Sequence, residues 1–156
     1  MKVEIKVKVA PAYNVACLLH TGPYKGQNMW QTEFNELTKW AKKRKLRTGK
    51  WIMYFIDNWS EQTQKKRRSI AAIEIKQKAK PEGKIQIMKL PRHKVVSVTF
   101  DPDKVSSDLV YHGLESWLES CTYKPTGRSR ELYNGNPWTN PHAWANCEVQ
   151  VPVRRK

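Results

Sequence analysis

The chain has 156 residues, of which 29 are Lys or Arg and 14 are Asp or Glu, so its formal net charge is +15. A hydrophobic fraction of 39% supplies the core of one ordinary domain, while no apolar run approaches the ~20 residues of a membrane span. Three unpaired Cys argue against a disulfide framework and the charged N-terminus excludes a signal peptide, so we expect a single-domain cytoplasmic protein.

The first half of the chain is predicted to fold as strand, strand, helix, strand, strand. Apolar and charged residues alternate at its start, as in a strand with one buried face, and Pro11 ends this strand. Apolar residues then recur at helical spacing, and a basic run follows them. The predicted elements are strands at 3–9, 14–20, 51–56 and 70–76 and a helix at about 27–45.

The second half of the chain repeats this order. Pro91 matches Pro11 at an offset of 80, and Ser106 or Ser107 is a suitable N-cap for the second helix. The predicted strands of this half are at 85–90, 95–100 and 146–153, with a further strand that begins at 128 and runs into a turn by 138. We therefore predict two repeats, 3–76 and 85–153, joined by a linker at 77–84 within one domain covering 1–156.

A duplicated unit of this kind predicts the α+β fold class. One unit has too little core to stand alone, whereas two can share a mostly antiparallel, eight-stranded sheet with both helices on one face. The repeats would then be related by pseudo-twofold symmetry. Because a groove must run between the two helices, and small molecules usually bind in such grooves, this is the expected binding site.

The stretch from Arg128 to Trp138 carries the most informative residues. Side chains two apart on a strand point the same way, so Glu131 and Tyr133 are expected on one face. The first repeat aligns with this stretch at an offset of 79, which places Tyr54 on Tyr133 and Ile52 at the position of Glu131. One repeat thus has an acid where the other is apolar, and this asymmetry points to a function for Glu131.

Several motifs together resemble the GyrI-like effector-binding family, found at the C-terminus of AraC-type and MerR-type multidrug regulators and as free-standing proteins. They are residues 9–16, the motif His20-Thr21-Gly22-Pro23-Tyr24, the strand at Glu131 and the closing residues 149–153. The resemblance covers 3–153. The sequence departs from the family pattern at 101–104, which replace a second Gly-Pro-Tyr turn. It also lacks DNA-binding helices, so a stand-alone module is expected.

The resemblance implies a central, aromatic cleft for lipophilic and often cationic compounds, with drug binding or sequestration as the function. The ligand-facing carboxylate of the family falls on Glu131 and its aromatic lining on Tyr133, Trp30, Tyr24 and Trp144, to which the repeat adds Tyr54. A ligand cation would offset the desolvation of a buried acid. The competing interpretation makes Glu131 a surface carboxylate paired with Arg128 or Arg130.

Two other functions stay open. A hydrolase of strained electrophiles would use Glu131 to activate water and Tyr133 or Tyr24 to protonate the leaving group. A DNA or topoisomerase partner would use the basic runs at 42–45 and 65–68, although solvated surface side chains are the favoured explanation of these runs. Since only one acid is visible at the site, a receptor is favoured over an enzyme. No cofactor, metal site or membrane partner is expected, and the oligomeric state is not indicated.

Overall fold

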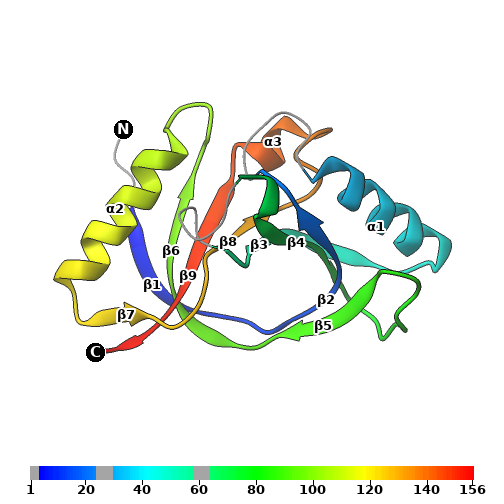
Figure 1. The fold of residues 1–156 in the computed structure, drawn as a ribbon, viewed down its shortest axis with the longest axis horizontal. Coiled ribbons are helices and arrows are strands. Elements are labelled where there is room, and N and C mark those ends of the chain that lie inside the picture. The colour runs from blue at the N-terminus through cyan, green and yellow to red at the C-terminus, as the bar shows by residue number, and fades with distance from the viewer. Residues whose placement is uncertain (1–3, 24–29, 58–63) are drawn as a thin grey trace.

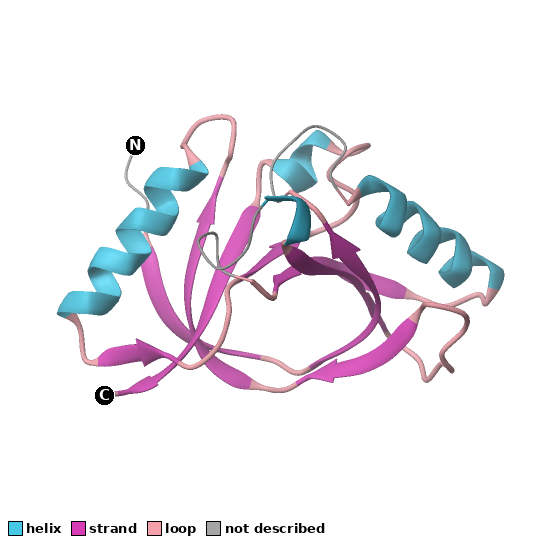
Figure 2. Ribbon diagram, in the orientation of Figure 1, coloured by secondary structure: helices cyan, strands magenta, loops and turns pink. Residues whose placement is uncertain are grey.

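The computed structural model describes residues 4–23, 30–57 and 64–156, which form an α+β fold. The elements follow the predicted order, with additions in the second half (Figures 1 and 2). In chain order they are β1 (Ile5–Ala10), β2 (Tyr13–Thr21), α1 (Gln31–Lys43), β3 (Thr48–Phe55), the 3-10 turn η1 (Gln64–Lys66), β4 (Arg68–Ile75), β5 (Gln86–Leu90), β6 (His93–Phe100), α2 (Ser107–Ser120), β7 (Tyr123–Pro125), β8 (Arg130–Tyr133), α3 (Pro141–Trp144) and β9 (Cys147–Arg155).

One nine-stranded antiparallel sheet holds the described part of the chain together. Eight strands follow the order β1-β6-β9-β8-β3-β4-β2-β5, and β7 pairs with β9 beside this path. The sequence predicted eight strands and two helices, so β7 and α3 were missed. At 3 and 4 residues, respectively, both are too short to carry a recognisable period.

The first strands of the two predicted repeats are exchanged in the sheet. β1 pairs with β6 of the second repeat, and β5 pairs with β2 of the first. Counterpart strands therefore lie at mirrored places in the strand order, with β3 and β8 adjacent at its centre. A duplicated unit would give this arrangement, and the duplication itself stays a prediction.

The alignment of Tyr54 with Tyr133 is out of register. Tyr133 lies opposite Trp51 across the β3–β8 ladder, whereas Tyr54 lies opposite Arg130. Because side chains alternate along a strand, Tyr54 and Tyr133 point to opposite faces of the sheet. In the same ladder Glu131 lies opposite Met53.

Both long helices pack on the same face of the sheet, which we call the helix face. Phe34, Leu37 and Trp40 of α1 are buried there, as are Leu114 and Leu118 of α2, because these residues recur every three or four positions. The space between α1 and α2 lies over the central strands (Figure 1). No helix in the described residues is long and apolar enough to span a membrane.

The opposite side of the sheet, here called the inner face, encloses a smaller core. This core runs from Leu90 of β5 and Tyr13 of β2 through Ala72 of β4 to Ile52 of β3 and Leu132 of β8, which are consecutive strands of the sheet. Figure 2 shows these strands curving as part of a ring. The strands at the two ends of the order, β1 and β5, remain its edges.

Candidate functional site

Glu131 lies on the helix face of β8, at the centre of the sheet. Tyr133 shares this face, as the strand period predicted. The carboxylate accepts two hydrogen bonds, one from the Tyr111 hydroxyl to Oε1 and one from the Tyr133 hydroxyl to Oε2, each at 2.9 Å. One hydroxyl comes from α2 and the other from β8 itself, so the carboxylate is held at the junction of helix and sheet.

Within the described residues, Glu131 has no basic partner. Burial raises the pKa of the carboxyl group, and the hydrogen bonds from Tyr111 and Tyr133 oppose this effect. No ion pair in the described part of the chain includes Glu131. Arg130, one of the two partners considered for a surface carboxylate, is buried on the other face of the sheet. The site therefore holds an acid whose charge the described side chains leave unmatched.

The two tyrosines that hold Glu131 stay protonated at physiological pH. Burial and the neighbouring carboxylate keep the pKa of both Tyr111 and Tyr133 well above the usual value for a phenol. Their hydroxyls consequently act as donors toward Glu131. Cys147, beneath Tyr133, has its pKa raised by burial and next by Glu131, so its thiol stays neutral and unreactive.

Trp144 adds an aromatic surface beside the carboxylate. Its ring stacks on Tyr133 with the centroids 6.1 Å apart and the planes 6° from parallel. Its indole Nε1 donates to Asp103 Oδ1 at 3.2 Å. Asp103 belongs to the turn at 101–104, the segment that departs from the family pattern, so this turn fixes the orientation of Trp144.

A second aromatic group continues from this surface toward α1. Phe34 of α1 stacks on Trp51 with centroids 4.8 Å apart, and Trp138 packs at 5.4 Å from Phe34 and 6.3 Å from Trp51. Trp51 in turn lies opposite Tyr133 in the β3–β8 ladder. The helix face thus carries aromatic rings from α1 across the central strands to Glu131.

The remaining predicted site residues are not all brought to this place. Trp30 is buried on the helix face at the start of α1, where its Nε1 donates to Ser69 Oγ at 2.7 Å. Its backbone φ of 62° is rare outside glycine and is stabilised by this burial and hydrogen bond. Tyr54 points to the inner face, away from Glu131. Tyr24 lies outside the described residues.

The sequence reasoning missed Tyr111 as a functional residue. Tyr111 follows Phe34 at an offset of 77, so it occupies the place in the second predicted helix that Phe34 takes in the apolar stripe of the first. A phenol in that stripe requires a hydrogen-bond partner, which was the available signal. Among the described residues no group of three His, Cys, Asp or Glu side chains is placed to hold a metal ion.

The basic runs lie at the surface. Lys42 and Lys43 are in the last turn of α1, where cations interact favourably with the helix carbonyls. Arg44, which follows them, pairs with Glu82 at 2.9 Å and covers the ring of Trp40. Lys65 and Lys66 are exposed in η1. These positions match solvated surface side chains.

Comparison with known proteins gives a family and several structural neighbours. The family model of the GyrI-like small molecule binding domain matches residues 3–154. The C-terminal domain of EcmrR is 20% identical, with a TM-score of 0.76 and full coverage of both chains. In an EcmrR–DNA complex, the match covers 99% of this chain and 58% of EcmrR, with 20% identity and a TM-score of 0.82.

Two further neighbours share the fold at lower similarity. A hydrolase from Listeria innocua is 11% identical, with a TM-score of 0.67 and coverage of 97% of this chain and 92% of the other. SAV2435, solved bound to tetraphenylphosphonium, is 11% identical, with a TM-score of 0.53 and coverage of 97% and 94%. A search of curated proteins gives no match.

Proposed function

Because the chain belongs to the GyrI-like small molecule binding domain family, we propose that it binds lipophilic, cationic aromatic molecules on the helix face, against Glu131. The observation that carries this proposal is a carboxylate held by two phenols without a basic partner in the described residues. Glu131 is partly buried, where an unpaired charge is costly, and a ligand cation would supply the missing charge. The binding of tetraphenylphosphonium by SAV2435 supports this class of ligand.

The aromatic rings provide the rest of the affinity. Trp144 and Trp138 are partly exposed and can offer ring faces or edges to an aromatic ligand, while the buried rings of Tyr133, Phe34 and Trp51 pack against them from below. A cation over such faces is attracted by their quadrupoles, by ~0.5–2 kcal/mol for each favourable contact. Long-range repulsion by the +15 charge is screened beyond ~8 Å at physiological salt, which leaves Glu131 dominant at close range.

The test is binding of tetraphenylphosphonium, followed by tryptophan fluorescence and calorimetry, beside triphenylphosphine oxide as a neutral analogue. We expect Glu131→Gln to weaken binding of the cation by about 1–3 kcal/mol and to leave binding of the neutral compound unchanged. Glu119→Gln, the same change at an exposed position of α2, should leave both affinities unchanged. Equal cation affinity in wild type and Glu131→Gln would overturn the proposed role.

The same side chains support hydrolysis of a strained electrophile as a second candidate. A raised pKa makes the Glu131 carboxylate a better base toward water, and a Tyr111 or Tyr133 hydroxyl is placed to donate a proton. Mass spectrometry of mixtures with strained-ring electrophiles separates the two functions. A receptor returns each compound unchanged, whereas a hydrolase converts many equivalents to the water adduct. Salt-sensitive DNA binding without small-molecule binding would contradict both.

A further inference from the structure

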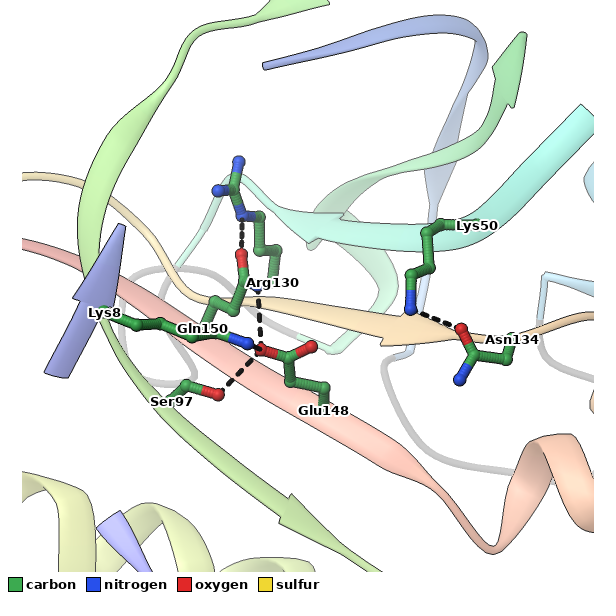
Figure 3. Close-up of polar contacts among 7 residues, drawn as sticks. All are labelled: Lys8, Lys50, Ser97, Arg130, Asn134, Glu148 and Gln150. Atoms are coloured by element: carbon green, nitrogen blue, oxygen red, sulfur yellow. Dashed lines mark hydrogen bonds and ion pairs between the residues drawn. The ribbon is translucent and has the colours of Figure 1, made fainter. Parts of the chain in front are cut away.

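The inner face of the sheet contains a buried cation without a matching anion. Arg130 is only 3% exposed. Its Nε donates to Gln150 Oε1 at 2.8 Å, while Nη2 is buried and has no hydrogen-bond partner among residues 4–23, 30–57 and 64–156. Figure 3 shows the guanidinium group pointing away from Glu148. An unsatisfied buried donor costs roughly 1–3 kcal/mol, and more when it is charged, so the structure lacks a partner at this point.

The nearest carboxylate in the network is already matched. Glu148 Oε2 accepts from Gln150 Nε2 at 2.9 Å and from Ser97 Oγ at 2.7 Å, and it pairs with Lys8 Nζ at 2.6 Å (Figure 3). Lys8 is half exposed and brings its charge to Glu148 from the solvent side. Gln150 therefore separates Arg130 from Glu148, and the guanidinium charge stays uncompensated.

The surroundings of Arg130 suit an organic anion. Tyr54 lies directly opposite Arg130 in the β3–β8 ladder, on the same face, and is half-buried. Tyr13, Ile52 and Leu132 of the inner core complete the neighbourhood. Burial raises the pKa of Tyr13, so its hydroxyl remains a donor at neutral pH. Two phenols, one guanidinium group and apolar side chains thus meet on the curled face of the sheet.

We propose that the inner face binds a small monocarboxylate, such as acetate, through Arg130. A carboxylate matches the planar donors of a guanidinium group, and its single charge balances the single uncompensated cation. A phosphate dianion would exceed that charge among apolar side chains. This site is separate from Glu131, which lies on the other face of the sheet. It would make the protein a binder of two ligands of opposite charge.

The experiment compares sodium acetate with sodium chloride at equal ionic strength, using thermal unfolding and nitrogen-15 spectra of arginine side chains. At ~10 times its Kd, acetate should raise the Tm by roughly 3–6 °C for a chain of this size. The Arg130 Nε and Nη signals, assigned by their absence in Arg130→Gln, should shift in wild type with acetate and not with chloride. The Glu131→Gln variant should respond as wild type does.

Three results would overturn the proposal. The first is an equal Tm rise with chloride, which indicates a non-specific salt effect. The second is the absence of any acetate-dependent shift of the Arg130 signals in wild type, as expected if buried water completes the hydrogen bonding. The third is an undiminished acetate response in Arg130→Gln. If that variant does not fold, Tyr54→Phe, which removes one hydroxyl at a half-buried position, should weaken the acetate response several-fold, and an unchanged response overturns the proposal.

Discussion

Ionisation of the Glu131 side chain carries a cost in stability for the ligand-free protein. Its pKa is raised by burial, so the folded chain binds this proton more tightly than the unfolded chain does. Stability therefore falls as pH rises from the unfolded pKa through the folded pKa, and the full cost is present above the folded value. Binding of a cation would recover this free energy, which links ligand affinity to the instability of the empty site.

From this linkage we predict that Glu131→Gln stabilises the ligand-free protein at pH above the folded pKa. The substituted amide can still form hydrogen bonds with the Tyr111 and Tyr133 hydroxyls, and it removes the cost of ionising the carboxyl group. Tm should therefore rise by roughly 2–4 °C, equivalent to about 1 kcal/mol for a chain of this size. The gain should vanish below ~pH 4, where both chains carry a neutral group. Thermal unfolding across pH measures this, and a lower Tm at neutral pH would contradict it.

The candidate site was predictable only where one strand determined it. The period of two placed Glu131 and Tyr133 on one face, and the structure confirms this. Tyr111 lies 20 residues away on α2, and its hydrogen bond to Glu131 depends on how the helix is rotated over the sheet. Tyr54 was misplaced because an odd offset between repeats reverses the face of a strand residue. Predicting contacts between elements requires knowing how the elements pack together, and the sequence pattern does not give this information.

Among the secondary structure elements, α2 offers a direct test of glycine in a helix. Gly113 is exposed in its interior, and a Cβ at this position would meet nothing within 4 Å. We predict that Gly113→Ala stabilises the protein by roughly 0.5–1 kcal/mol, because alanine loses less backbone entropy on folding. Urea unfolding gives this difference.

The matched control is Gly83, in the turn between β4 and β5. A Cβ at this position would also have open space around it, but the backbone φ is +58°. The left-handed conformation costs a non-glycine residue roughly 1–2 kcal/mol, so Gly83→Ala should destabilise the protein. The same sign of change in both variants would show that solvent exposure, rather than backbone conformation, decides the outcome.

The long elements followed from the sequence because each repeats its period several times. The helices were recognised from stripes such as Phe34, Leu37 and Ala41, all buried against the sheet. The stretch 128–138 was predicted as a strand that runs into a turn, and the structure has a strand at Arg130–Tyr133 with turns in the residues that follow. The pairing of β1 with β6 was not predictable, because strand exchange leaves the alternation along each strand unchanged.

At the scale of the molecule, the exchanged strands make each half depend on the other. β1 finds its partner in the second half and β5 in the first. We predict that fragments 1–83 and 84–156 are each unfolded alone and recover the native circular dichroism and tryptophan fluorescence when mixed. Each fragment alone lacks a strand and the other half of the core around Trp51 and Tyr133. A fragment that unfolds cooperatively on its own would contradict this prediction.

The basic composition affects how the two edge strands can pair with other copies of the chain. β1 and β5 each end the strand order, so in the described residues each has one backbone edge that no other strand occupies. A free edge is a template for aggregation by pairing with another chain. Lys6 and Lys8 lie along β1 and Lys89 along β5, so edge-to-edge contact would bring lysines together between molecules that each carry +15. Repulsion between like charges of this kind opposes edge-to-edge pairing of copies of the chain.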